Sequence, residues 1–377
     1  MIGNFKIIII FLFLTNISCF YKPWNLIIKK LSIQCKNDIS EEEYKNEYYN
    51  YLLENNIISQ QHLLQCGNSE HIDDIIQSRS KNYNIFKTNY LKIKHFNSQN
   101  NSFKLDLNHF ADNYDDDNNN LMKKKITLYD IIKNDFIGVK QIIADPQYYL
   151  DKYRNMPNEI IWNNSIISNV KNQGRCGSCW AFSTTGALEA NMRINNFVID
   201  RLSEQELVDC STENSGCNGG LMHTALDYCI ENNGLSSNHD YNYTERTGTC
   251  LHNCNLNETI QLNRVIGSNI SDYKFTVPRS VIDIKASLKK GPICIALDAS
   301  PIEFRFYKEG IIDIPNRNTS QMNHAVLLTG YSINENGSYW IIQNSWGEKW
   351  GDNGYAKIKI QNGDGVLLSQ LYGVYIY

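Results

Sequence analysis

The stretch VKNQGRCGSCWAFS, residues 170–183, places a glutamine and two cysteines in a turn-rich segment that runs directly into an apolar sequence. The spacing of Trp180, Ala181 and Met192 suits an amphipathic, largely buried helix that begins at Cys179. A thiol at a helix N-terminus is favoured as thiolate by the helix dipole. Taken alone, the stretch is compatible with a zinc ligand pair, a redox CxxC, half of a disulfide or a catalytic nucleophile.

Length and charge narrow the class of protein. The chain has 377 residues, of which 42% are hydrophobic, so it can bury a large core in two or three structural units. It carries 36 basic and 40 acidic residues, a net charge of -4, and this balance gives no support for nucleic acid or an anionic membrane as partner.

The first residues, MIGNFKIIIIFLFLTNISCF, predict a secretory signal peptide over residues 1–19. They contain Lys6, an apolar run from Ile7 to Leu14, and then small and polar residues. This run is shorter than the roughly 20 residues that span a bilayer, and no later run is longer, so we expect no membrane span. We therefore expect the secretory pathway, ending in a lysosome, another acidic vacuole or the extracellular space.

Export changes the interpretation of the 11 cysteines, because disulfides persist in the secretory pathway. A zinc site would need Cys250 and Cys254 as a second ligand pair, and their spacing is irregular for that purpose. A thioredoxin-like redox pair lacks a βαβ context. Both alternatives remain open at this level but are disfavoured.

Composition changes near Asn155. Residues 20–155 are rich in Asn, Lys, Ile and Asp and include the tract DNYDDDNNNLMKKK at 112–125, which is typical of a solvated loop. After Pro157, glycine and tryptophan become common and turn sequences alternate with short apolar runs. We therefore divide the chain into a signal peptide (1–19), an upstream segment (20–155) and a C-terminal domain (156–377).

Two further motifs lie in the C-terminal domain. His324 stands in the β-like run MNHAVLLTGY, and Asn344 stands at a strand end in YWIIQNSWGEKWG. Alone, each has an ordinary explanation as a core histidine or a turn former. Together with Gln173 and Cys179, at these spacings, they resemble the papain-like cysteine peptidases. The resemblance covers residues 156–377 and includes LSEQELVDCS (202–211), GCNGGLM (216–222) and NSWGEKWGDNGYAKIKI (344–360).

The resemblance implies an α+β fold of two subdomains, one helical (roughly 166–270) and one β-barrel-like, and a mainly helical N-terminal prosegment. It also implies cysteine endopeptidase activity without cofactor or metal. Cys179 would be the nucleophile, held as thiolate by a protonated His324 that Asn344 orients. The Gln173 amide and the Cys179 backbone N–H would form the oxyanion hole, and Trp346 would shield the histidine from water.

Other roles are also implied by the resemblance. Cys176 would pair with Cys217, and Cys210 with Cys250, although Cys254 competes for the second bond; Cys229 and Cys294 fit buried free thiols. The apolar specificity pocket would take a bulky apolar residue second before the scissile bond, as in cathepsin L-like enzymes. The expected substrate-binding residues are Gly219, Gly220, Leu221, Met222, Ala296, Met322, Ala325, Trp346 and Leu371.

The upstream segment resembles an inhibitory prosegment, with departures. A Glu and an Arg of the family's prosegment helix are replaced by Ser78 and Asn82, and a usual Gly by Asp106. An unrelated helical domain is the alternative. The matching positions are Phe86, Asn89, Ile93, Asn97, Asn108, Phe110 and Asp112.

Two other functional classes stay open: a catalytically silent storage or binding relative, and a secreted disulfide- or zinc-scaffolded binding module. The first is disfavoured because the four site residues are present. The expected partners are peptide and protein substrates and the chain's own prosegment, and we expect a monomer. Sequons that fit a secretory route occur at Asn163, Asn242, Asn257, Asn269, Asn318 and Asn336.

Overall fold

The computed structural model describes residues 39–58, 70–113, 156–197, 201–253, 263–276, 280–314, 322–335, 337–360 and 373–376. The chain forms two compact units, Met1–Lys92 and Ile93–Tyr377, and the division falls within one helix. The expected signal peptide and the boundary at residue 155 lie outside the described residues. Within the described ranges, no helix combines the length and the apolar character needed to cross a bilayer.

The first unit consists of helices α3 (Glu41–Glu54), α5 (Glu70–Ser78) and most of α6 (Ser80–Ser98). Ser40 caps α3 by accepting a hydrogen bond from the Glu43 N–H at 3.1 Å. Aromatic side chains hold α3 on α6: the rings of Tyr48 and Phe86 lie 4.9 Å apart, and both are completely buried. These helices confirm the mainly helical prosegment predicted from the sequence.

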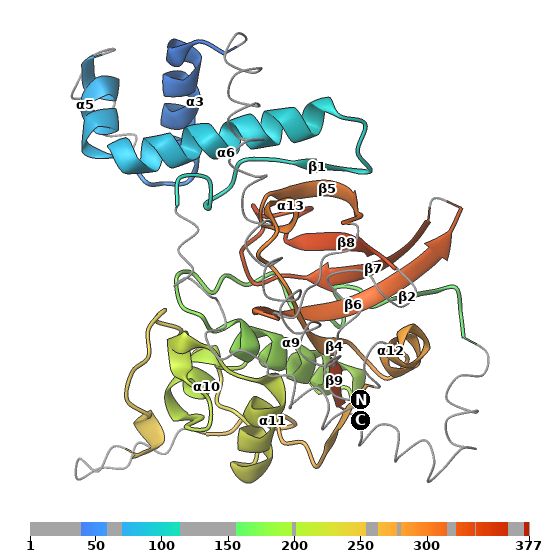
Figure 1. The fold of residues 1–377 in the computed structure, drawn as a ribbon. Helices are drawn as coiled ribbons and strands as arrows, with labels where there is room; N and C mark the ends of the chain where they lie inside the picture. The colour runs from blue at the N-terminus through green and yellow to red at the C-terminus, as the bar shows by residue number, and fades with distance from the viewer. Residues whose placement is uncertain are drawn as a thin grey trace, which may run out of the picture. The chain divides into compact units, whose positions relative to one another are not determined.

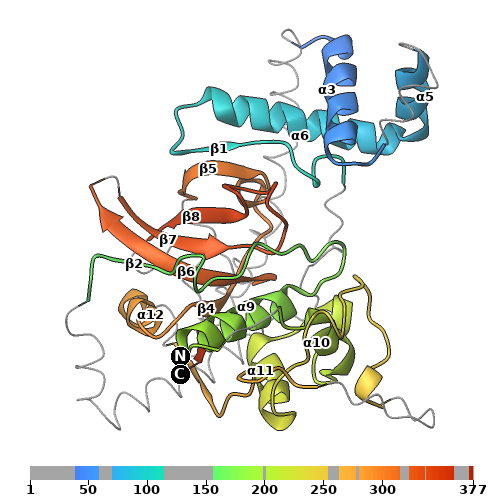
Figure 2. The same ribbon diagram turned by 180° about the vertical axis from the view of Figure 1, so that it is seen from behind.

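The helical part of the second unit is built around α9 (Cys179–Ile194), which lies between the sheet and two other helices (Figures 1 and 2). Trp180 and Leu188 are completely buried, and Gly186 allows Leu327 of a neighbouring strand to approach, since a Cβ there would lie 3.2 Å from it. The remaining helices are α10 (Glu204–Cys210), η1 (Gly216–Asn218), α11 (Met222–Glu231), η2 (Leu251–Asn253), α12 (Val281–Leu288) and α13 (Ile302–Arg305).

One nine-stranded sheet forms the other layer of this unit. Its strands follow the order β1-β5-β8-β7-β6-β4-β9-β3, and β2 pairs with β6. The central strand β4 is buried along its whole length and pairs antiparallel with β6, Ala296 opposite Ala325. The strands are β1 (Phe103–Leu105), β2 (Glu159–Ile161), β3 (Tyr273–Phe275), β4 (Ile293–Leu297), β5 (Tyr307–Ile312), β6 (His324–Asn334), β7 (Gly337–Gln343), β8 (Tyr355–Lys359) and β9 (Gly373–Ile376).

The upstream segment contributes the edge strand β1 to this sheet, which the sequence did not predict. Phe103 pairs with Gly310 of β5, and the Ser102 hydroxyl donates to the Ile311 carbonyl at 2.9 Å. Gly310 has φ +95°, and a Cβ there would lie 2.4 Å from the Ser102 carbonyl oxygen. The close approach therefore requires glycine. With α9, α10 and α11 in one layer and the sheet in the other, the second unit has the expected two-subdomain α+β fold.

Candidate active site

Cys179 is the first residue of α9, and its thiol is completely buried. Backbone hydrogen bonds reach the sulfur from Ala325 and Trp180, and one turn further along α9 the Ser183 hydroxyl donates to the Val326 carbonyl at 2.8 Å. The start of α9 therefore lies against the start of β6. Burial raises the pKa of the Cys179 thiol to about 12, although these hydrogen bonds act in the opposite direction.

His324 opens β6 and is completely buried. Its Nε2 lies 2.8 Å from the Asn344 Oδ1, so Nε2 carries the proton and donates it, and Nδ1 keeps its lone pair. Nδ1 is buried and has no hydrogen-bond partner within the described part of the chain. Burial lowers the pKa of His324 to about 4, partly opposed by the hydrogen bond to Asn344.

Asn344 follows β7, where its backbone N–H donates to the Gly354 carbonyl at 2.9 Å. The indole of Trp346 stacks on the His324 ring at 4.6 Å with an interplanar angle of 28°. Phe304 and Trp350 meet the same indole edge-on, at 5.6 and 5.5 Å. The histidine and its amide partner thus lie inside an aromatic box, where water cannot compete for their hydrogen bond.

Gln173 is held at nearly every polar atom. Its backbone N–H donates to the Ser345 carbonyl at 2.9 Å, and its Oε1 accepts from the Ser345 hydroxyl at 2.7 Å. Its Nε2 donates one hydrogen to the Cys176 carbonyl at 2.9 Å, which leaves a second amide hydrogen for another acceptor. The sequence did not single out Ser345, although its place between Asn344 and Trp346 was a signal.

The expected substrate-binding residues approach Cys179 from two directions. A Cβ on Gly220 would lie 2.7 Å from the Trp180 ring and 2.5 Å from the Asn214 Oδ1, so this backbone passes directly beside the start of α9. Leu221 and Met222 continue from there into α11 and are buried. On the sheet side, buried Ala296 pairs with Ala325, and buried Met322 precedes β6. Leu371 lies outside the described residues.

Burial acts against the expected thiolate and imidazolium. It raises the pKa of Cys179 to about 12 and lowers that of His324 to about 4. The physical reason is burial, which disfavours both charged forms and which sequence spacing does not report.

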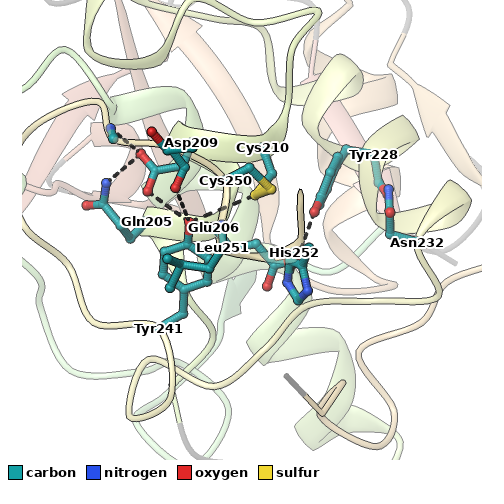
Figure 3. The surroundings of a disulfide bond; sticks show 12 residues. Gln205, Glu206, Asp209, Cys210, Tyr228, Asn232, Tyr241, Cys250, Leu251 and His252 are labelled. Carbon is teal, nitrogen blue, oxygen red and sulfur yellow. Dashed lines mark hydrogen bonds and ion pairs between the residues drawn. A yellow bond between two sulfur atoms is a disulfide. The ribbon is translucent and has the colours of Figure 1, made fainter. Parts of the chain in front are cut away.

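The structure contains both disulfides that the resemblance implied, Cys176–Cys217 and Cys210–Cys250. The first bond removes Cys176 from the zinc and redox alternatives. Beside the second, shown in Figure 3, the Tyr241 hydroxyl donates to Asp209 at 2.9 Å and lies 3.9 Å from the Cys210 sulfur. Cys254 lies outside the described residues, and Cys229 and Cys294 are buried free thiols.

The prosegment motif after β1 belongs to the second unit and contacts the peptidase domain there. The Asn108 side chain donates to the Arg305 carbonyl at 2.8 Å, and Phe110 meets Trp346 edge-on at 4.7 Å. The Arg305 guanidinium lies 5.0 Å from the Phe110 ring centre. Phe110 therefore packs on the indole that covers His324.

Comparisons with known proteins agree with this geometry. Residues 156–372 match the papain family cysteine proteases, and residues 77–117 match the cathepsin propeptide inhibitor domain (I29). Cysteine protease XCP2 of Arabidopsis thaliana is 34% identical over 299 residues, which cover 79% of this chain and 79% of that protein.

Two more relatives extend the comparison. A cathepsin L-like protein of Caenorhabditis elegans is 40% identical over 208 residues, 54% of this chain and 59% of its own. The structure of digestive procathepsin L2 proteinase from Tenebrio molitor larval midgut superposes with a TM-score of 0.68 at 27% identity and covers 89% of this chain and 98% of that one. The chain is a cysteine-type endopeptidase of the papain family, and it carries an inhibitor-type propeptide ahead of the peptidase domain.

Proposed function

We propose that Cys179, His324 and Asn344 carry out peptide-bond hydrolysis through a thioester. The observation that carries this proposal is the buried, unshared Nδ1 of His324, whose neighbour Ala325 contacts the Cys179 sulfur. Asn344 holds the opposite ring nitrogen at 2.8 Å, which fixes the tautomer with Nδ1 as the base. His324 therefore can take the thiol proton without any change of its own hydrogen bond.

In the reaction, the Cys179 sulfur attacks the scissile carbonyl carbon while its proton passes to His324 Nδ1. The carbonyl oxygen becomes an oxyanion, which accepts the second Nε2 hydrogen of Gln173 and the Cys179 backbone N–H. His324 then gives its proton to the leaving amine, and the C–N bond breaks. Water, deprotonated by His324, hydrolyses the thioester and restores the thiol.

The buried pair of this structure becomes competent when the site gains access to solvent. Burial is the first cause of both pKa shifts, so hydration lowers the pKa of Cys179 and raises that of His324. The two changes favour transfer of the thiol proton to the imidazole.

We propose a preference for a bulky apolar residue second before the scissile bond. The pocket residues that the structure describes are all apolar, and no charged group among them can pair with a basic substrate side chain. They are Leu221, Met222, Ala296, Met322 and Ala325.

We further propose that the chain is made with a signal peptide at 1–19, an inhibitory prosegment at 20–155 and a peptidase domain at 156–377. The contacts of Asn108 and Phe110 support docking of the prosegment beside His324. Secretion to a lysosome, vacuole or the extracellular space follows from the signal peptide, and the enzyme acts as a monomer on peptide and protein substrates.

The test is an active-site label. An epoxysuccinyl reagent should modify Cys179 alone in the processed enzyme, and Cys179→Ser and His324→Ala should abolish hydrolysis of a peptide substrate in a folded protein. Undiminished turnover by Cys179→Ser would rule out the nucleophile assignment. Absence of turnover in the wild-type enzyme after processing would favour a silent binding relative.

A further inference from the structure

The hydroxyl of Tyr243 connects the two ends of the segment that contains the proposed oxyanion donors. It donates to the Gln173 carbonyl at 2.8 Å and lies 2.6 Å from the Ser178 hydroxyl. Gln173 begins this segment, and Ser178 immediately precedes Cys179. We propose that Tyr243 is a positioning residue, which sets the orientation of the oxyanion hole without touching the substrate. This inference rests on the proposed roles of Gln173 and Cys179.

Counting protons fixes the direction of both hydrogen bonds. A tyrosine hydroxyl has one proton, and Tyr243 uses it on the Gln173 carbonyl, which can only accept. Ser178 is therefore the donor in the contact with Tyr243. Its alternative acceptor, the Cys176 carbonyl, lies much farther away, at 3.5 Å. The hydrogen bonds therefore all point the same way, from Ser178 to Tyr243 and from Tyr243 to Gln173.

The segment needs such an external hold at its glycine. Gly174 has φ +60°, a left-handed conformation that glycine adopts readily because it has no Cβ. The absence of a side chain also means that nothing on Gly174 itself restrains the backbone. The carboxylate of Glu245 occupies the space where its Cβ would be, 2.1 Å from that position. The Gln173–Gly174 peptide is therefore fixed mainly by its partners, and its carbonyl has Tyr243 as partner.

Gln173 is consequently held from both subdomains. Ser345, beside Asn344, binds its backbone N–H and its side-chain oxygen, whereas Tyr243 binds its carbonyl from the helical side. With these bonds in place, the free Nε2 hydrogen has one direction available to it. Loss of the Tyr243 bond would leave the fold intact but loosen the Gln173 main chain, from which the side-chain amide projects. Donors must be oriented in advance to stabilise an oxyanion.

The ring of Tyr243 is anchored independently of its hydroxyl. It meets Phe182 of α9 edge-on at 4.9 Å and 88°, a packing contact that phenylalanine can reproduce. Burial raises the pKa of Tyr243 well above its usual value, so the hydroxyl keeps its proton at every pH at which such an enzyme works. Tyr243→Phe is therefore a clean removal of the two hydrogen bonds.

A matched control lies two residues away. Tyr241 donates its hydroxyl to Asp209 at 2.9 Å, beside the Cys210–Cys250 disulfide and away from the oxyanion segment (Figure 3). Tyr241→Phe removes a buried tyrosine hydroxyl in the same way, so it reports general structural damage. Both variants should be prepared as full-length zymogens and processed with trace wild-type enzyme.

We expect Tyr243→Phe to lower kcat about tenfold with little change in KM, less than the about 10²- to 10³-fold loss of a donor itself. A peptide aldehyde, whose hemithioacetal oxygen occupies the oxyanion hole, should bind about tenfold more weakly. Alkylation of Cys179 by an epoxysuccinyl reagent, which needs no oxyanion, should keep its rate. Tyr241→Phe should leave all three quantities unchanged.

A double mutant tests whether Tyr243 acts through Gln173. In a Gln173→Ala background, Tyr243→Phe should reduce kcat less than it does in the wild type. Equal reductions in the two backgrounds, or equal losses of aldehyde binding and epoxide alkylation, would overturn the positioning role. Normal labelling of Cys179 in these variants separates that failure from failure of the proposed nucleophile, which would show as absent labelling in the wild type as well.

Discussion

Replacing His109 by glutamine should make the zymogen resistant to opening in mild acid. The His109 ring is half-buried and lies 4.0 Å from the Phe110 ring, over which the Arg305 guanidinium is placed. Burial, and then the positive charge of Arg305, lower the pKa of His109 from 6.5 to about 4. Arg305 is the charged group that acts on this imidazole among the residues described.

Prosegment docking depends on pH because the pKa of His109 is lower in the folded zymogen than in the opened form. The docked prosegment favours neutral His109, so its contribution is complete above pH 6.5 and is lost as pH falls from 6.5 toward 4. The drop in pKa corresponds to roughly 3 kcal/mol once protonation is complete. Because the ring is only half-buried, we expect about half of this energy, which is roughly a tenfold change in the population of the opened form.

The assay uses two inactive full-length zymogens, Cys179→Ser and Cys179→Ser with His109→Gln. Trace processed enzyme is added to both, and the rate of prosegment cleavage is followed from pH 7 to pH 4. At pH 7 the two rates should agree, whereas at pH 4.5 the glutamine variant should be cleaved about tenfold more slowly. Because the same enzyme cleaves both, its own pH dependence cancels in the ratio.

His95→Gln is the control, because this histidine belongs to the same prosegment and its ring makes an exposed hydrogen bond with the Gln99 side chain, at 3.0 Å. The Cys179→Ser zymogen with His95→Gln should show the same dependence of cleavage rate on pH as the Cys179→Ser zymogen. Identical profiles for His109→Gln and its parent would refute the role of His109. Any acid dependence that remains in the glutamine variant would come from groups other than His109.

Three further predictions concern the peptidase domain. Gln173→Ala should lower kcat by about 10²- to 10³-fold in a peptide assay, because one oxyanion donor is lost; an unchanged kcat would contradict that role. Replacing both Cys176 and Cys217 by serine should lower the free energy of unfolding by about 4 kcal/mol, since the bond closes a loop with a sequence separation of 41; denaturant titration measures it. Leu371→Glu should raise the rate with Arg relative to Leu second before the scissile bond, and an unchanged profile would place Leu371 outside the pocket.

The sequence alone could predict the residues whose role depends on the kind of side chain and on the spacing of motifs along the chain. Cys179 at a helix start, His324 at a strand start and Asn344 at a strand end appear where the motifs placed them. The bonds that Gln173 makes to Ser345 and Tyr243 join residues 172 and 70 positions apart. No local pattern predicts such pairs, because they form only when segments far apart in the chain fold against one another.

The departures in the prosegment also have physical explanations that the sequence alone did not offer. Ser78 and Asn82 replace an expected Glu and Arg. Glu41 of α3 instead accepts a hydrogen bond from the Tyr83 hydroxyl at 3.0 Å and pairs with Lys87 at 2.5 Å. The charged contact of α6 is therefore made with a residue of α3.

Asp106 stands where a glycine is usual in the family. Its backbone does not enter the left-handed region, and its side chain accepts from the Leu107 N–H at 2.8 Å while its own N–H donates to the Phe306 carbonyl. A side chain is therefore tolerated there.

Burial of Cys179 predicts a chemical contribution to latency. Burial raises the pKa of this thiol and so disfavours the thiolate, which is the effective nucleophile. Iodoacetamide at pH 7 should therefore alkylate Cys179 at least about 10²-fold more slowly in the intact zymogen than in the processed enzyme. Peptide mass analysis distinguishes Cys179 from the buried thiols of Cys229 and Cys294. Equal rates would mean that the thiolate already exists before processing, and that burial of the pair does not contribute to keeping the zymogen inactive.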